Sequence, residues 1–286
     1  MAEAVDIATE RWREVFNGGP YSSFTMANAI MHKLELSYRD ALTSPRALRA
    51  FSPQTVTRED LFQPPFLTTW FDSTGRCTSF ALKVAYHLEV EHPSLYSFEY
   101  FGIGKHRVAH CKNTGVLIDS SSTSGATVLN ESDEWTELKG LTGHWKYIDN
   151  KLIYERDEHI RTATSITAEK ALAVCLKEVV NKPILVCLFR NISDNGITFS
   201  CLIQWQIAHK CVELIPDLKE KATKGLITFS REGTPETLEQ CVTKFKGFIE
   251  EWGDMNQWKV DDHEEIHTPL WSAAVDLWGF PQWSET

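Results

Sequence analysis

The chain has 286 residues, 42% of them hydrophobic and 24% charged, with a formal net charge of -10 at pH 7. This composition is typical of a folded protein with a substantial core, and it excludes collagen-like, coiled-coil and disordered classes. An acidic surface repels nucleic acids and anionic membranes, so we expect neither as a partner. The acidic start, Met1 to Asp6, lacks the pattern of a secretory signal, and no apolar run approaches the ~18 residues of a membrane span. We therefore expect a cytoplasmic protein, whose oligomeric state the sequence leaves open.

The seven cysteines predict reduced thiols. Their number is odd, none forms a CxxC pair, and most lie in apolar runs. Buried, reduced side chains fit this pattern better than a disulfide framework or a zinc site. The positions are Cys77, Cys111, Cys175, Cys187, Cys201, Cys211 and Cys241.

The N-terminal part predicts helices, over residues 4–16, 24–43 and 45–51, because apolar residues recur there at three- and four-residue steps. Prolines between residues 53 and 65 then predict a loop. A further helix is predicted over 77–90, with Pro93 beyond its end. Its apolar stripe consists of Phe80, Ala81, Val84, Ala85 and Leu88.

Alternating residues predict a half-buried strand over 95–101, and Gly102-Ile103-Gly104 predicts a turn after it. Residues 106–111 and 116–121 then predict a hairpin around Asn113-Thr114-Gly115.

The second half predicts mainly strands, with two helices. The helices are expected over 167–180, capped by Thr167, and over 235–252, after a Thr-Pro-Glu start signal. The strands are expected near 145–155, 183–189, 197–207, 210–215 and 225–230.

The order of these elements predicts an α+β fold in a single catalytic domain over residues 1–286. Within it we expect a helical N-terminal part (1–68), a core with a Cys-bearing helix packed on an antiparallel sheet (69–125), and a strand-rich part with two helices (126–286).

Cys77 is the candidate nucleophile. A thiol in the first turn of a helix lies near the positive end of the helix dipole and near free backbone N–H groups, and both favour the thiolate. The N–H of Cys77 can also donate to an oxyanion. Gly75 lets the chain turn sharply into the helix and lets a substrate approach closely.

A thiolate of this kind needs a base, and the base needs a group that orients it. If Asn113-Thr114 forms the hairpin loop, Asp119 lies on the same face as His106 and His110 and diagonal to each, within reach of a His–Asp hydrogen bond. If Thr114-Gly115 forms the loop, His110 lies directly opposite Asp119. With a three-residue loop and a bulge, Asp119 points away from both histidines. The residues alone leave these registers open.

The motifs around these residues resemble the transglutaminase-like superfamily, over roughly residues 70–122. They are Gly75-x-Cys77-x-x-Phe80-Ala81, His106-x-Val108 and Leu117-Ile118-Asp119. The resemblance implies a Cys–His–Asp triad in which the Cys opens a helix and the His begins a strand. It therefore favours His106 over His110 as the base. A weaker resemblance to arylamine N-acetyltransferases, which share this core and a similar length, would imply an acyl-CoA donor.

These residues predict a thiol enzyme that forms an acyl-enzyme on Cys77 and cleaves or transfers an amide or acyl group of a small molecule or peptide. His106 would act as general base and acid, and Asp119 would orient it. This chemistry requires no cofactor and no metal. The alternatives are an acyl-CoA-dependent acyltransferase of the arylamine type and a non-catalytic binding protein on the same scaffold.

A second motif, His263-Glu264-Glu265-Ile266-His267, matches the HExxH pattern of zinc peptidases. That pattern lies inside a helix, whereas here Pro269 follows almost at once, the segment is acidic, and no third ligand follows at helical spacing. We therefore expect no zinc site there.

Overall fold

The computed structural model combines helices with antiparallel sheets, which confirms the α+β class. It describes residues 2–17, 21–44, 47–50, 77–104, 106–120, 125–138, 143–171, 184–193, 196–206, 211–215, 227–230 and 273–277, and single positions at 173, 177, 243 and 247. The predicted loop at 53–65, most of the predicted helix at 235–252, and the HExxH motif lie outside these residues.

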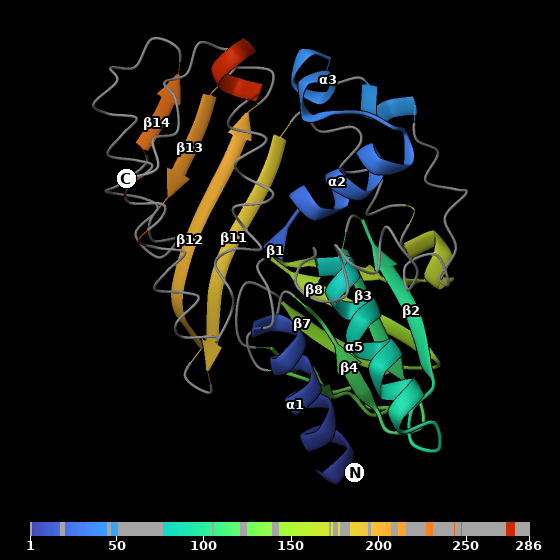
Figure 1. The fold of residues 1–286 in the computed structure, drawn as a ribbon. Helices are drawn as coiled ribbons and strands as arrows, with labels where there is room; N and C mark the ends of the chain where they lie inside the picture. The colour runs from blue at the N-terminus through green and yellow to red at the C-terminus, as the bar shows by residue number, and fades with distance from the viewer. Residues whose placement is uncertain are drawn as a thin grey trace.

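Three antiparallel sheets make up the described β structure (Figure 1). Sheet one has the order β10-β2-β3-β4-β5, with β2 (Phe98–Ile103), β3 (His106–Cys111), β4 (Val116–Ile118), β5 (Thr127–Val128) and β10 (Thr164–Ile166). Sheet two has the order β6-β7-β8-β9, with β6 (Thr136–Glu137), β7 (His144–Ile148), β8 (Lys151–Arg156) and β9 (His159–Thr162). Sheet three has the order β1-β11-β12-β13-β14, with β1 (Tyr21–Ser22), β11 (Ile184–Ser193), β12 (Gly196–Gln206), β13 (Cys211–Ile215) and β14 (Ile227–Ser230).

The helical N-terminal part contains α1 (Ala2–Asn17), α2 (Phe24–Lys33), α3 (Tyr38–Thr43) and the 3-10 turn η1 (Ala47–Ala50). The prediction of one helix over 24–43 is wrong, because the chain breaks between α2 and α3. Glu35 adopts a left-handed conformation with φ of 54°. Ser37 then starts α3 with a capping box, in which its hydroxyl accepts from the Asp40 N–H and the Asp40 carboxylate accepts from the Ser37 N–H.

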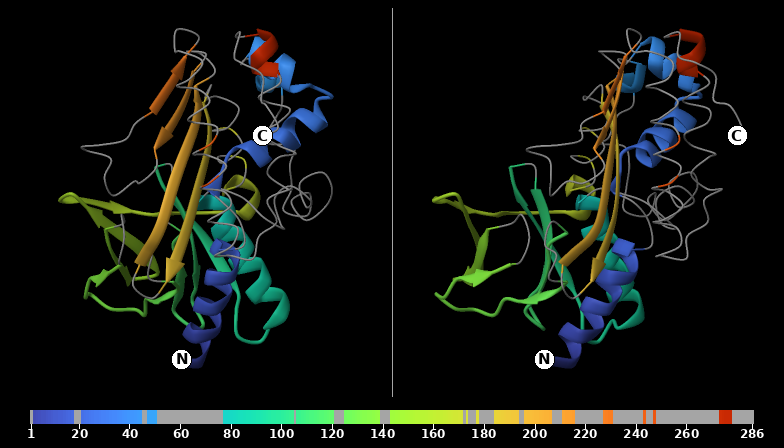
Figure 2. Two further views of the ribbon diagram at one scale, coloured as in Figure 1. Left: turned by 60° about the vertical axis from the view of Figure 1, so that its left-hand side comes forward. Right: turned by 90° about the vertical axis from the view of Figure 1, so that its left-hand side faces the viewer.

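Sheet one lies between two other layers, with helices α1 and α5 on one side and sheet two on the other (Figures 1 and 2). Helix α5 (Cys77–Glu91) packs on one face of β3 and β4, and α1 packs against α5. The apolar stripe of α5 is buried, with Phe80, Val84 and Leu88 fully inaccessible to solvent. Burial of a stripe that repeats every three to four residues provides the main driving force for placing α5 on the sheet.

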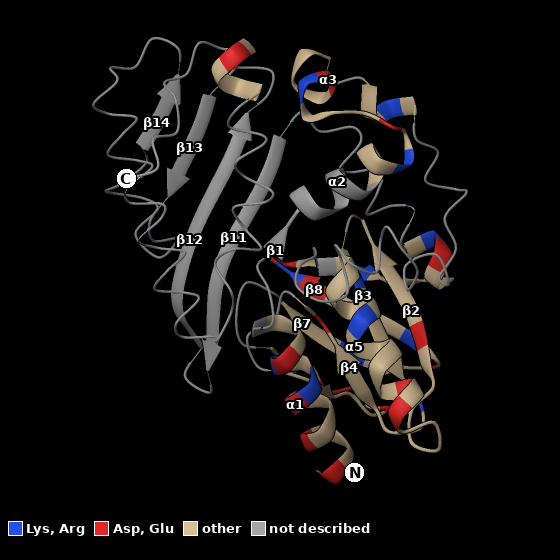
Figure 3. Ribbon diagram, viewed as in Figure 1, with Lys and Arg blue, Asp and Glu red and all other residues tan. Residues whose placement is uncertain are grey.

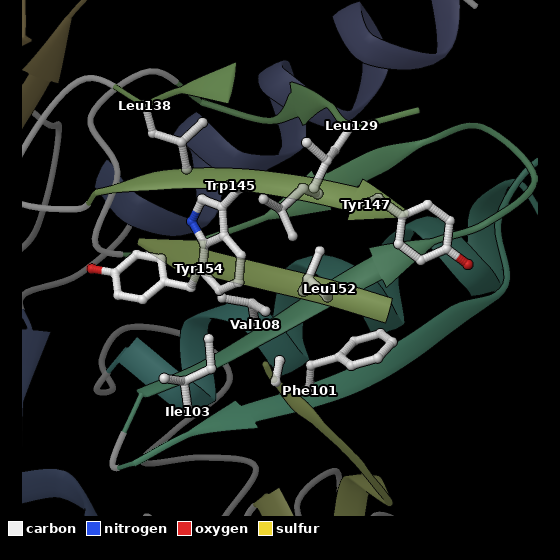
Figure 4. Packing of buried hydrophobic residues seen from close by; sticks show 11 residues of the cluster. Phe101, Ile103, Val108, Leu129, Leu138, Trp145, Tyr147, Leu152 and Tyr154 are labelled. Carbon is white, nitrogen blue, oxygen red and sulfur yellow. The ribbon is translucent and has the colours of Figure 1, made fainter. Parts of the chain in front are cut away.

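Sheet two covers the other face of sheet one. The interface between them is a cluster of buried side chains that alternate along the strands (Figure 4). Its members are Phe101, Ile103, Val108, Leu117, Leu129, Leu138, Trp145, Tyr147, Leu152, Tyr154 and Ala163. On β3 the even-numbered residues therefore face sheet two, and the odd-numbered residues face α5.

The connection between α5 and β3 differs in detail from the prediction. The carbonyl of His92 accepts from the N–H groups of Leu95 and Tyr96, so the chain is still turning there and β2 begins only at Phe98. Gly102 and Ile103 belong to the strand rather than to a turn. The turn is short, because Ile103 pairs with His106 and Gly104 takes a φ of +55°.

Charged side chains of both signs are interspersed over α1 and α5 (Figure 3). One ion pair links these helices, since the Arg11 guanidinium lies 2.5 Å from the carboxylate of Glu91 on α5. The same guanidinium lies 2.7 Å from the carboxylate of Glu14 within α1. Within the described part of the chain, every helix is too short or too polar to cross a bilayer.

Candidate active site

The first residues of α5 and β3 lie at the same end of sheet one. The end of α5 lies beside the start of β2, because the Glu89 carboxylate accepts a 2.7 Å hydrogen bond from the Phe98 N–H. The 15 residues of α5 rise about 22 Å, and the 6 residues of β2 rise about 20 Å. The chain therefore returns to the level of the start of α5 before β3 begins, as Figure 1 shows.

His106 and Asp119 form a hydrogen-bonded pair at this end. Nε2 of His106 lies 2.9 Å from Oδ1 of Asp119. The Asp119 side chain has no exposed surface, whereas 22% of the His106 side chain remains exposed. A buried carboxylate is therefore paired with an imidazole that solvent reaches from one side, the arrangement in which the carboxylate orients a base.

Trp145 on β7 contacts the same carboxylate from sheet two. Its indole Nε1 donates a 3.1 Å hydrogen bond to Oδ2 of Asp119. The indole and imidazole rings lie 6.4 Å apart at their centroids. Each oxygen of the buried carboxylate thus meets a ring N–H, as a charge removed from water requires.

The register of the β3–β4 hairpin brings Asp119 to His106. Ala109 pairs with Ile118 and His110 with Leu117, which is the pairing predicted for a loop at Asn113-Thr114. Asp119 follows the last residue of β4 and lies diagonal to His106, on the face that points toward sheet two. The loop itself is longer than predicted, since it extends to Gly115, whose φ is +69°.

Arg107 fixes the turn that precedes His106. Its Nη1 donates to the carbonyls of Gly104 and His106, at 2.7 and 2.6 Å. Gly102 lies directly opposite on β2, and a Cβ there would lie 3.1 Å from the guanidinium carbon. The absence of a side chain at Gly102 therefore lets the guanidinium lie flat on β2 and hold the first residue of β3.

His110 is buried in a different environment. Its Nε2 lies 3.0 Å from the Leu129 carbonyl, and its ring lies 4.6 Å from that of Tyr147. Burial lowers the pKa of His110 below its ordinary value, although the hydrogen bond to Leu129 and the charge of Glu99 act in the opposite direction. Of the two candidate bases, His106 is the one that the structure brings into contact with Asp119.

The described side chains thus bring together two members of the predicted triad. The third, Cys77, is the first residue of α5, but its side chain and the preceding Gly75 lie outside the described part. The contact of Cys77 with His106 accordingly remains a prediction. Among the described residues, no three His, Cys, Asp or Glu side chains gather as a metal site would require.

Trp145 was not among the predicted site residues. Alternation over 144–148 is enough to predict that Trp145 points into the core, since it and Tyr147 occupy alternate positions. The alternation carries no information on the partner of the indole N–H, because Asp119 lies 26 residues away along the chain.

No protein-family model, no curated protein and no solved structure matches this chain. The resemblance to the transglutaminase-like superfamily therefore rests on the motifs and spacing of the chain itself.

Proposed function

We propose that this protein is a thiol enzyme that forms an acyl-enzyme on Cys77. The observation that carries the proposal is the hydrogen bond from half-buried His106 to fully buried Asp119, at the end of sheet one where the Cys77 helix begins. A solvated surface His–Asp pair contributes little to stability, but a buried carboxylate that holds an accessible imidazole is typical of acid–base catalysis.

The proposed mechanism follows from the position of the imidazole. Because Asp119 accepts from Nε2, the proton occupies Nε2 and the basic lone pair lies on Nδ1. Nδ1 takes the proton of the Cys77 thiol, and the thiolate attacks the carbonyl carbon of an amide, ester or thioester. The first-turn N–H groups of α5 stabilise the oxyanion. The imidazolium then protonates the leaving group, and water or an amine releases the acyl group from Cys77.

Asp119 contributes by stabilising the imidazolium and fixing its orientation, and it remains ionised throughout. The substrate is an acyl or amide compound of a small molecule or peptide, and no cofactor or metal enters these steps. The thiol has to be reduced, in keeping with the cytoplasmic location that we expect.

The test is alkylation of the intact protein by iodoacetamide at pH 6.5, followed by mass spectrometry of the peptide that contains Cys77. A thiolate held by His106 should react at least tenfold faster than glutathione under the same conditions, and Cys77→Ser should abolish the labelling. Buried Cys111 serves as an internal reference for the same sample. A Cys77 thiol no faster than glutathione would refute the proposal and leave the binding-protein alternative.

The identity of the acyl donor distinguishes the proposed enzyme from the acyl-CoA-dependent alternative. Incubation with radioactive acetyl-CoA should leave Cys77 unlabelled if the donor is an amide or ester, and should label it if the protein is an acyltransferase of the arylamine type.

A further inference from the structure

We propose that Trp145 is a positioning residue for the His106–Asp119 pair, and that sheet two is therefore part of the catalytic apparatus. This inference rests on the thiol chemistry proposed above. Its basis is the hydrogen bond from Trp145 Nε1 to Asp119 Oδ2, on the oxygen opposite the one that faces His106.

The second donor matters because a carboxylate can rotate. The terminal torsion of an aspartate side chain is broad, so one hydrogen bond leaves the plane of the carboxylate poorly defined. Two N–H groups on different oxygens, 2.9 Å from His106 and 3.1 Å from Trp145, fix that plane. The direction of Oδ1, and with it the direction of the imidazole, is then set by a residue on β7.

The indole is itself held rigidly. Trp145 is fully buried, and it pairs across the strands with Tyr154, whose ring lies 4.6 Å away. The Tyr154 hydroxyl accepts a 3.2 Å hydrogen bond from the N–H of Gly143, just before β7. A Cβ on Gly143 would collide with the carbonyl oxygen of Glu155, so the glycine permits the close approach of β7 to β8. These contacts give the N–H of Trp145 a fixed direction.

The electrostatic setting makes this donor important. The Asp119 side chain has no exposed surface, so water cannot replace a lost donor without a rearrangement of the core. Among the described residues of these two sheets, the buried titratable side chains between the sheets include His110, Tyr147 and Tyr154, and Arg107 and Cys111 lie on the opposite face of β3. The indole N–H of Trp145 is therefore the hydrogen-bond donor that sheet two contributes to the carboxylate.

The experiment compares Trp145→Phe with a matched control, Trp12→Phe. Trp12 is also buried, and it stacks on Phe16 with centroids 4.3 Å apart, but its Nε1 has no hydrogen-bond partner among the described residues. Both variants lose the same atoms from a core, and only one loses a hydrogen bond to Asp119. Iodoacetamide alkylation of Cys77 is measured for each from pH 5.5 to 9.

We expect Trp145→Phe to slow alkylation at pH 6.5 about tenfold, which corresponds to the loss of one charge-assisted hydrogen bond. We also expect it to shift the pH–rate profile to higher pH. Trp12→Phe should stay within twofold of the wild type with an unchanged profile. If Trp145→Phe does not fold, a benzothienylalanine at position 145, which has the shape of indole without its N–H, replaces it in the comparison.

The outcomes separate this inference from the proposed function. Fast alkylation in the wild type that Trp145→Phe or the benzothienylalanine variant leaves unchanged would overturn the role of Trp145 alone. Equal slowing by Trp145→Phe and Trp12→Phe would also overturn it, since a general loosening would then explain both. A wild-type thiol as slow as glutathione would overturn both proposals together.

Discussion

Replacement of Asp119 by asparagine tests the centre of the site with almost no change in shape. An amide has one accepting oxygen and one donating NH2 group, whereas the carboxylate accepts from both His106 and Trp145. One of the two ring N–H groups must then face another donor, or His106 must change tautomer and present its basic nitrogen to the amide. The change of tautomer removes the base from the thiol, and either outcome removes the negative charge that stabilises the imidazolium.

The magnitude follows from the hydrogen bonds that are lost. A hydrogen bond to a charged group contributes about 1.5–3 kcal/mol. Because 1.36 kcal/mol corresponds to a factor of ten in rate, a loss near 2 kcal/mol predicts that Cys77 is alkylated roughly 30-fold more slowly. A ring N–H left without an acceptor in the core should in addition lower the free energy of unfolding by about 1–3 kcal/mol.

The assay is the second-order rate of Cys77 alkylation by iodoacetamide at pH 7, together with urea denaturation. Asp133→Asn is the matched control, because Asp133 is an exposed aspartate whose carboxylate lies 2.9 Å from the Lys146 ammonium rather than from a ring N–H. It should react within twofold of the wild type. An Asp119→Asn protein that is folded and reacts as fast as this control would refute the role of Asp119.

Three further predictions concern the same strands. His106→Gln should slow alkylation at least 30-fold, whereas His110→Gln should leave it within twofold, because the His110 ring bonds to the Leu129 carbonyl rather than to the site; comparable rates in both variants would contradict the assignment of the base. Since burial lowers the pKa of His110 below 6.5, the unfolded chain takes up a proton that the folded protein does not, and the free energy of unfolding should fall as the pH drops below about 6.5. Urea titrations at pH 5, 6 and 7 should show a smaller fall in His110→Gln, and equal slopes in both proteins would exclude this histidine as the cause. Gly115→Ala should lower the free energy of unfolding by about 1–2 kcal/mol, because φ is +69° and a Cβ would collide with the Asn130 side chain; a thermal melt that matches the wild type would contradict the left-handed turn.

The elements with local signals were predictable from the sequence. The apolar stripe of α5 and the alternation over residues 96–100 depend on residues a few positions apart, so burial follows from the helical or strand repeat. The break between α2 and α3 was missed, because the apolar repeat continues across it. The sequence does contain the capping box of Ser37 and Asp40, which starts a new helix at this point although the apolar repeat continues.

The hairpin register was open in the sequence for a physical reason. The three candidate loops differ by one or two residues, and nothing within the hairpin distinguishes them. In the structure, the carbonyl of Gly115 accepts a 2.7 Å hydrogen bond from the Leu129 N–H, so a later segment of the chain fixes the turn. The same segment supplies the carbonyl that binds His110. The choice between the two histidines therefore depended on a tertiary contact.

The burial of Asp119 by Trp145 has a consequence for the order in which the protein assembles. Helix α5 and the β3–β4 hairpin are close in sequence and can meet early, but the carboxylate stays hydrated until the β7–β8 hairpin docks on sheet one. In refolding from urea, the Cys77 thiol should thus become reactive only when the Trp145 indole leaves water. The recovery of thiol reactivity and the burial of the indole should therefore have the same time constant.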